Sequence, residues 1–247
     1  MFDFYTYGIF AYMCQGMEVG VTLGILCAVS VLLCMAVGYL LGSINTSIII
    51  SKLFFGEDVR NYGSGNAGMT NVLRTYGKKS AALTLLGDVI KTVVAIIIGR
   101  FIGFPVAFTA ISGEVIYGVS FAGYITALFC VIGHTFPAYY KFKGGKGVLC
   151  AAASVAMLSP LTFVWLMLMF VIIVVGTKYV SLGSVIAVMT YPILLDRIEG
   201  TSICTVVAFL IAALVVYNHR ENIKRLYEGK ENRISIGKKD KERSDKE

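Results

Sequence analysis

Charged residues are scarce in this sequence. Asp, Glu, Lys and Arg make up only 15% of its 247 residues, whereas a soluble domain of ordinary composition contains about 25%. Hydrophobic residues make up 57%, and apolar runs of about 20 residues, the length that a helix needs to cross a membrane, recur along the chain. The shortage of charge therefore excludes an ordinary soluble domain. The apolar runs predict an all-α, polytopic integral membrane protein.

Lysine and arginine are absent from residues 1–18. A cleavable signal peptide carries a basic segment ahead of its apolar core, so the first span is predicted to be an uncleaved anchor. The six cysteines show no CxxC spacing and mostly fall in apolar runs. We therefore expect buried thiols, and neither a disulfide framework nor a metal site.

Seven apolar segments are candidates for transmembrane helices. The shortest, Gly147–Leu158, has 12 residues, which reach about 18 Å as a helix against a hydrocarbon core of about 30 Å. It is either a short span or the first half of a broken helix. The six longer segments are Val19–Leu41, Ser80–Ile102, Gly113–Gly133, Leu161–Gly176, Val180–Leu195 and Ser202–Tyr217.

The distribution of basic residues predicts the orientation. Of the 22 lysines and arginines, 19 lie in residues 42–79, 134–146 and 218–247 or at Lys178. The positive-inside rule places these four segments in the cytoplasm. The net charge of +7 therefore indicates membrane orientation, and no nucleic-acid partner is expected.

The same charges predict the number of crossings. Residues 147–176 have to cross twice, with Pro160 at the outer turn, to keep the basic C-terminal segment inside. About seven transmembrane helices follow, with the N-terminus outside and the C-terminus inside. A five-helix arrangement, with residues 147–176 re-entrant, is the alternative. Residues 1–233 are predicted to form a single transmembrane domain, and the charged residues 234–247 a disordered tail.

The first of three unusual polar loops reads GSGNAGMTNVLR. Gly63 and Gly65 allow the backbone to turn, so that successive amides form an anion-binding nest. Asn66 or Thr70 is predicted to cap a short helix, whose N-terminus adds partial positive charge. Arg74, one turn further, is placed to clamp a phosphate through two hydrogen bonds. The alternative is a flexible surface loop before an ordinary helix.

The second polar loop, GHTFPAYYKFKGGKGV, places Lys143-Gly144-Gly145-Lys146 shortly before a helix. This order offers ammonium and amide donors to a phosphate. It is not a Walker A loop, because the GxxxxGK[ST] spacing is unmatched and Val148 replaces the hydroxyl that would hold magnesium. The alternative is a basic loop that contacts anionic lipid headgroups.

The third polar loop, HRENIKRLYEGKENR, follows the last span. His219 and Asn222 are three residues apart and share one face of a continuing helix. Polar side chains at a membrane boundary are costly unless they have partners, so a site is predicted here, with a solvated helix end as the alternative. Asp88 and Lys91 have the same spacing inside the second span, where we expect a structural ion pair that holds the helix against the loops.

All three loops fall on the predicted cytoplasmic face, which predicts a site for phosphorylated ligands at the inner membrane surface. Their sequences closely resemble the three motifs of bacterial membrane acyl-phosphate:glycerol-3-phosphate acyltransferases, the PlsY family. The resemblance extends over residues 20–233. The chain departs from the family pattern at Asn45, where Pro is common, and at Met69, where a small residue is usual. Three shorter stretches also fit: GSI at 42–44, DVR at 58–60 and LGDVIK at 86–91.

The resemblance implies an enzyme of the bacterial inner membrane. Such an enzyme moves a fatty acyl group from acyl phosphate to the 1-hydroxyl of glycerol 3-phosphate, which yields 1-acyl-glycerol 3-phosphate and phosphate and begins phospholipid synthesis. No metal, cofactor or protein partner is implied; membrane lipids surround the protein. The other acyltransferase arrangement, a His with an Asp five residues later, is absent after both His134 and His219.

Motif by motif, the resemblance assigns the site residues. Catalytic residues on the glycerol-3-phosphate side are implied to be Ser64, Arg74, Lys146, His219 and Asn222. Residues that hold the acyl phosphate are implied to be Gly63, Gly65, Asn66, Gly144 and Gly145, with Asn71 and Lys143 as further binding residues.

Three questions stay open at this stage. The proton of the attacking hydroxyl goes either to a substrate phosphate or to His219. The stretch Phe163–Phe170 either lines a groove for the acyl chain or faces lipid and neighbouring helices. A transporter for a phosphorylated solute also uses basic loops and broken helices, and a scaffold that binds anionic lipid is a third hypothesis.

Overall fold

The computed structural model describes residues 21–103, 118–200 and 203–234, the pairs 108–109 and 115–116, and positions 9 and 13. The N-terminal segment, the beginning of the span predicted from Gly113 and nearly all of the predicted tail lie outside the described residues. The elements are α3 (Val21–Gly42), α4 (Thr46–Phe55), η1 (Val59–Asn61), α5 (Met69–Ile102), β1 (Phe108–Thr109), β2 (Val115–Ile116), α6 (Gly118–Thr135), η2 (Ala138–Tyr140), α7 (Val148–Leu158), α8 (Pro160–Thr177), α9 (Val180–Glu199), α10 (Ile203–Asn218) and α11 (Arg220–Tyr227).

The prediction of an all-α integral membrane protein is confirmed, since the described strands are a single two-residue antiparallel pair. Five stretches of the described residues are long and apolar enough to cross a membrane, and the bent pair α10 and α11 makes a sixth if it counts as one span. Helix α7 has 11 residues, which reach about 16 Å. The number of seven crossings therefore stays a prediction.

Helices α7 and α8 carry the chain away from one end of the bundle and back to it. Lys146, just before α7, donates a hydrogen bond to Asn222. Ser181, just after α8, donates one to Glu231 at 2.9 Å, and Glu231 also binds Asn222. The reversal falls at Pro160, in the first turn of α8, where the missing N–H breaks no helical bond. This path agrees with the two passes predicted for residues 147–176.

Small residues allow α3 and α6 to pack closely. Gly38 and Gly42 are four residues apart on α3, and a Cβ at Gly42 would lie 2.3 Å from the carbonyl oxygen of Cys130 on α6. On α6, a Cβ at Gly133 would lie 2.3 Å from the carbonyl oxygen of Tyr39. Helices in a membrane associate through such close contacts, because lipid provides no hydrophobic drive between them.

A buried ion pair joins α5 to the ends of α3 and α6. Lys91 Nζ lies 2.9 Å from Asp88 Oδ1 and 2.9 Å from His134 Nδ1. It also donates to the carbonyl oxygens of Gly42 and Ile44, at 3.1 and 2.7 Å. The end of a helix leaves carbonyl groups without a partner inside the helix. Lys91 supplies hydrogen-bond donors to two such carbonyls where α3 ends. The predicted ion pair is therefore present, and these contacts agree with the structural role expected for it.

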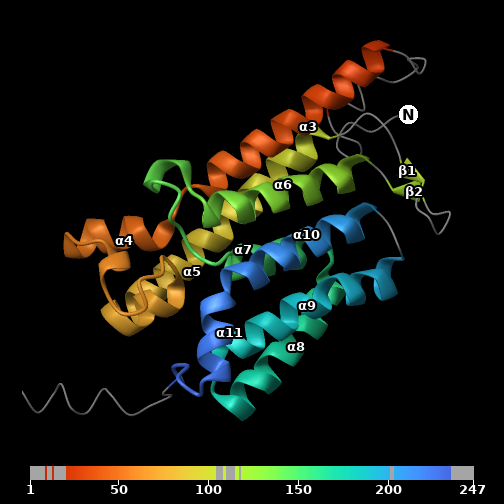
Figure 1. The fold of residues 1–247 in the computed structure, drawn as a ribbon. Helices are drawn as coiled ribbons and strands as arrows, with labels where there is room; N and C mark the ends of the chain where they lie inside the picture. Colours follow the sequence, from red (N-terminus) through yellow and green to blue (C-terminus); the bar gives the residue numbers. More distant parts are fainter. Residues whose placement is uncertain are drawn as a thin grey trace, which may run out of the picture.

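The elements that carry the polar loops gather at one end of the bundle, towards the left in Figure 1. They are α4, η1, the start of α5, the loop between α6 and α7, and α11; α3 begins at the opposite end. Asn45, the departure from the family pattern, caps α4 by accepting from the amide of Ile48 at 3.3 Å. The main apolar core lies among α6, α7, α9 and α10.

Candidate active site

The first polar loop is organised by Asn71, which is buried in the first turn of α5. Its Oδ1 accepts from the amide of Ser64 at 2.9 Å, and its Nδ2 lies 3.0 to 3.1 Å from the carbonyl oxygens of Val59, Tyr62 and Asn66. One side chain therefore fixes four backbone groups. The structure gives Asn71 a role in shaping the loop, and its contact with substrate stays a prediction.

The loop leaves backbone donors open at the start of α5. Helix α5 begins at Met69 with Gly68 as its N-cap, and no side chain caps it; the predicted cap by Asn66 or Thr70 is wrong. Among the described residues, no protein acceptor takes the amides of Asn66, Ala67, Met69 and Thr70. Free amides at a helix N-terminus favour an anion.

Gly63 and Gly65 lie beside these amides. Their φ angles are +59° and +71°, in the left-handed region that glycine adopts without steric cost. Ser64 between them is exposed, with its amide held by Asn71. The amide of Gly65 also bonds within the loop, to the carbonyl of Tyr62 at 3.0 Å, so the open amides are those from Asn66 towards α5 rather than the predicted ones at Ser64 and Gly65.

The second polar loop uses its glycines for packing. The amide of Gly144 donates to the carbonyl of Thr135 at 3.0 Å, and that of Gly145 donates to the carbonyl of His134 at 3.1 Å. Neither amide is available to a phosphate in this arrangement, contrary to the predicted cradle. A Cβ at Gly145 would lie 2.2 Å from His134 Nε2 and 2.6 Å from the carbonyl oxygen of Ala67. The glycines therefore bring the second loop directly onto the first.

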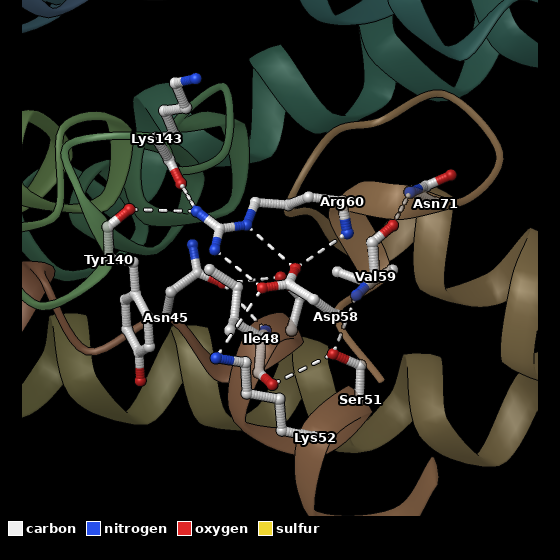
Figure 2. A network of polar contacts seen from close by, with 11 residues as sticks. Asn45, Ile48, Ser51, Lys52, Asp58, Val59, Arg60, Asn71, Tyr140 and Lys143 are labelled. Carbon is white, nitrogen blue, oxygen red and sulfur yellow. Dashed lines mark hydrogen bonds and ion pairs between the residues drawn. The ribbon is translucent and has the colours of Figure 1, made fainter. Parts of the chain in front are cut away.

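Arg60, in η1, joins the same two loops (Figure 2). Its Nε and one terminal nitrogen donate to Asp58 at 2.9 and 2.7 Å, and the other terminal nitrogen donates to the carbonyls of Tyr140 and Lys143 at 3.0 and 2.8 Å. The hydrogen bonds from Arg60 to the carboxylate lower the pKa of Asp58. Lys143 was predicted to bind substrate; its carbonyl is held by Arg60, and its side chain points away from this clamp (Figure 2).

His219 lies at the bend between α10 and α11 and is only 3% exposed. Its Nδ1 lies 2.7 Å from the carbonyl oxygen of Val215. A carbonyl only accepts hydrogen bonds, so Nδ1 carries the proton and Nε2 carries the lone pair. Burial, with a smaller effect of the charge on Lys146, lowers the pKa of His219 to about 4. The imidazole is therefore neutral at physiological pH.

Lys146 and Asn222 meet at the third loop. Lys146 Nζ donates to Asn222 Oδ1. Burial, together with the positive charges of Arg225 and Arg74, lowers the pKa of Lys146 to about 8, although Glu231 opposes this shift. Desolvated cations at close range bind anions strongly, so this cluster suits a phosphate.

Glu231 was not identified from the sequence as a site residue. Burial alone would raise its pKa, but hydrogen bonds from Asn222, Arg225 and Ser181, at 2.7 to 2.9 Å, lower it. Glu231 thereby fixes the amide of Asn222 with its oxygen towards Lys146. The sequence offered one indication of its role: Glu231 is a carboxylate in the basic third loop, which also contains the predicted site residues His219 and Asn222.

The structure thus brings four of the five predicted catalytic residues into one charged cluster. Arg74 lies close enough for its charge to lower the pKa of Lys146, and Lys146 neighbours both His219 and Asn222. Arg74 and Ser64 are exposed. Ser64 joins the cluster through the first loop, without a direct side-chain contact to it among the described residues.

An apolar cavity of about 140 Å³ lies beside the cluster, between α7, α8 and α9. It begins at Val148, two residues after Lys146, and at Val215, whose carbonyl binds His219. Along α8 it is lined by Phe163, Leu166, Met167 and Phe170, whereas Val164, Trp165 and Leu168 are exposed on the other side. One face of the stretch 163–170 therefore lines a groove and the other faces outwards.

A bundle of apolar helices that gathers cations, open amides and a neutral histidine beside an apolar cavity defines a class of protein. It is the class of integral membrane proteins, and here the charged cluster and the apolar cavity together suit an anionic ligand with an apolar chain. The family model described as glycerol-3-phosphate acyltransferase matches residues 32–229. The chain belongs to the glycerol-3-phosphate acyltransferase family.

Individual relatives agree with this assignment. A glycerol-3-phosphate acyltransferase of Clostridioides difficile is 42% identical over 198 residues, which are 80% of this chain and 92% of the relative. One from Geobacter sulfurreducens is 38% identical, over 81% of this chain and 95% of the relative.

Solved structures of PlsY (YgiH), an integral membrane glycerol 3-phosphate acyltransferase, have the same fold. The glycerol 3-phosphate form has a TM-score of 0.72 and 36% identity, and covers 83% of this chain and 96% of that one. The lysophosphatidic acid form has a TM-score of 0.70 and 34% identity, with the same coverage.

Proposed function

We propose that this protein transfers a fatty acyl group from acyl phosphate to the 1-hydroxyl group of glycerol 3-phosphate. The products are 1-acyl-glycerol 3-phosphate (lysophosphatidic acid) and inorganic phosphate, in the first step of phospholipid biosynthesis. The observation that carries the proposal is the apolar cavity that begins beside Lys146 and His219. The cavity suits a fatty chain and the cations suit phosphate groups, so one site fits both halves of an acyl phosphate.

The charge of the site suits two phosphate-bearing substrates, which repel each other. An acyl phosphate is already activated, so the reaction needs position and charge neutralisation more than a covalent nucleophile. Arg74, Lys146, Asn222 and Ser64 are assigned to glycerol 3-phosphate. The open amides between Asn66 and Thr70 replace those of Gly144 and Gly145 as the proposed cradle for the acyl phosphate.

In the proposed step, the 1-hydroxyl oxygen attacks the acyl carbonyl carbon. The ester C–O bond forms, the bond between the carbonyl carbon and the phosphate oxygen breaks, and the hydroxyl proton is released. His219 with a pKa of about 4 is a weaker base than a phosphate monoester, whose second pKa is about 6. A substrate phosphate therefore takes the proton of the 1-hydroxyl, while Nε2 of His219 accepts a hydrogen bond from the neighbouring 2-hydroxyl of glycerol 3-phosphate and so orients the substrate.

The pH dependence of His219→Ala tests this division of roles. Loss of an orienting hydrogen bond is expected to lower kcat roughly 100-fold, the cost of a misplaced reactant. The ionisation that limits kcat at the acidic side is expected to keep its apparent pKa, since it belongs to the phosphate. Disappearance of that ionisation in the variant would make His219 the base.

The activity itself is tested with purified protein in lipid vesicles. Given acyl phosphate and glycerol 3-phosphate, the protein is expected to release phosphate and lysophosphatidic acid in equal amounts. Lys146→Met, which removes the ammonium group and keeps an unbranched side chain one atom shorter, is expected to abolish both. Uptake of labelled glycerol 3-phosphate into the vesicles without lipid product would instead support the transporter. The proposed location is the bacterial inner membrane, with the three loops in the cytoplasm.

A further inference from the structure

A strained turn, Lys141–Phe142, lies immediately before Lys143 in the second loop. Lys141 and Phe142 both have φ of +56°, a left-handed conformation that residues other than glycine adopt at a steric cost. Both side chains are exposed, so they do not hold the turn by packing. Two consecutive residues in this conformation persist only where the surroundings fix them.

The backbone on each side of the turn is fixed by different groups. Arg60 holds the carbonyls of Tyr140 and Lys143, which directly flank the two strained residues. Within the loop, the amide of Phe142 donates to the carbonyl of Pro137 at 3.0 Å. Among the described side chains, the guanidinium of Arg60 supplies the hydrogen bonds that reach both sides of the turn (Figure 2).

The guanidinium is itself held in place from α4. Asp58 binds it through both carboxylate oxygens, and Ser51 Oγ accepts from the amide of Val59 at 3.1 Å. Two donors of the fork therefore face a carboxylate while a third faces the two carbonyls. A lysine ammonium lacks this planar, preorganised set of donors.

We propose that Arg60 is a positioning residue, which holds the Lys141–Phe142 turn in its strained form and so delivers Lys146 to Asn222. From the carbonyl of Lys143 that Arg60 holds, the chain reaches Lys146 in three residues, and the amides of the two intervening glycines are bonded to the end of α6. A relaxed turn would move this short segment as a unit. The consequence for catalysis rests on the proposed function; the consequence for the loop does not.

Arg60→Lys tests the proposal, because it keeps the positive charge and removes the planar set of guanidinium donors. We expect kcat/KM to fall roughly 10- to 100-fold, the range expected when a reacting group is displaced by about an ångström. Glycine at both strained positions, Lys141→Gly with Phe142→Gly, removes the steric cost. This pair is expected to change the wild-type protein little and to restore most of the activity of Arg60→Lys. An Arg60 that instead contacts substrate predicts no rescue, and an Arg60 that is needed only for its charge predicts no loss of activity in Arg60→Lys.

Lys52→Ala is the matched control. Lys52 also faces Asp58, at 3.9 Å, but its side chain is 55% exposed, so its loss is expected to change activity less than about twofold. Trypsin cleavage after Lys143, measured on the full protein in detergent, gives a readout that does not need activity. Faster cleavage in Arg60→Lys, with Lys52→Ala like wild type, supports the proposal. Unchanged cleavage, or activity lost without rescue by the glycine pair, overturns it.

Discussion

The ammonium group of Lys146 donates a hydrogen bond to Oδ1 of Asn222, which lies 76 residues further along the chain. This bond joins the second polar loop to α11 and places a half-buried cation against an amide that Glu231 fixes from its other side. The bond holds one of the three donors of the ammonium group, so that two remain for a phosphate. We therefore expect phosphate binding at the site to depend on the charge of Lys146.

The charge of Lys146 predicts how activity depends on pH. Folding lowers its pKa from the ordinary value of 10.5 to about 8, so the free enzyme loses this cation as the pH rises through about 8. We expect kcat/KM for glycerol 3-phosphate to fall over that range. In kcat the fall is expected at higher pH, because a bound phosphate stabilises the ammonium. Steady-state kinetics between pH 6 and 10 checks both.

Two variants identify the group that titrates. Lys146→Arg stays protonated over the whole range, so its lower activity is expected to show no fall near pH 8. Glu231→Gln removes a charge that raises the pKa of Lys146, so the fall is expected at lower pH than in the wild type. A fall at an unchanged pH in both variants would assign it to another group.

Asn71 predicts a second result, on the shape of the first loop. Asn71→Ala leaves the amide of Ser64 and three carbonyls without their side-chain partner. We expect a loss of about 1–3 kcal/mol in stability, the cost of unpaired polar groups, and a raised KM for acyl phosphate, because the open amides lose their arrangement. Thermal inactivation and initial rates measure the two effects.

The control for Asn71 lies in η1, two residues before the first loop. Asn61 is exposed, and Asn61→Ala is expected to match the wild type in both measurements. Asn71→Asp keeps an acceptor for Ser64 but turns a carboxylate oxygen towards three carbonyls, so it is expected to be at least as damaging as Ala. An Asn71→Asp variant of wild-type stability would contradict the shaping role.

Much of the helix pattern could be predicted from sequence, because apolar length and the placement of Lys and Arg act locally. The predicted limits of α3, α8 and α10 lie within two residues of those observed. The roles of individual polar residues depend on packing over long distances. Arg60 contacts carbonyls 80 and 83 residues away, and nothing in its neighbours along the chain distinguishes it from a solvated arginine.

The glycines of the second loop illustrate the same limit. A run such as Lys143-Gly144-Gly145-Lys146 is equally compatible with amides that point to a ligand and amides that bond to the protein. The choice depends on where the end of α6 lies, and the structure places the carbonyls of His134 and Thr135 against these amides. The glycines therefore indicate that another group comes close to the backbone here. Tertiary structure determines that this group is the end of α6 and not a ligand.

Orientation in the membrane gives a third prediction. Arg197, near the end of α9, and Glu57, just after α4, are both exposed and lie at opposite ends of the bundle. In intact cells, a membrane-impermeant thiol reagent is expected to label Arg197→Cys and to leave Glu57→Cys unlabelled until the membrane is opened. The wild-type protein is the control for its own cysteines. The reverse pattern would invert the topology derived from the basic residues.

The cavity beside the site gives a fourth prediction, on the length of the acyl chain. Along α7, α8 and α9, the lining residues furthest from the polar loops are Val155, Phe163 and Tyr191. The cavity spans eight residues on each of these helices, so that its first and last lining residues are seven helical rises, or about 10 Å, apart. An apolar cavity of comparable size in another protein stays dry and accepts benzene, so this one suits a short length of hydrocarbon. The lining residues at this far end are expected to limit how far the chain reaches along the helices.

Phe163→Ala removes volume from the lining at that far end, and Ala152→Phe fills part of the cavity. We expect Phe163→Ala to shift kcat/KM towards longer acyl phosphates and Ala152→Phe to shift it towards shorter ones, with kcat/KM for glycerol 3-phosphate less affected. Trp165→Ala is the matched control, since it removes an aromatic side chain from the exposed face of the same helix; its chain-length profile should equal that of the wild type. Because removal of core volume costs stability, the comparison uses ratios between chain lengths measured on one preparation. Equal ratios in Phe163→Ala, Ala152→Phe and wild type would show that the acyl chain lies elsewhere.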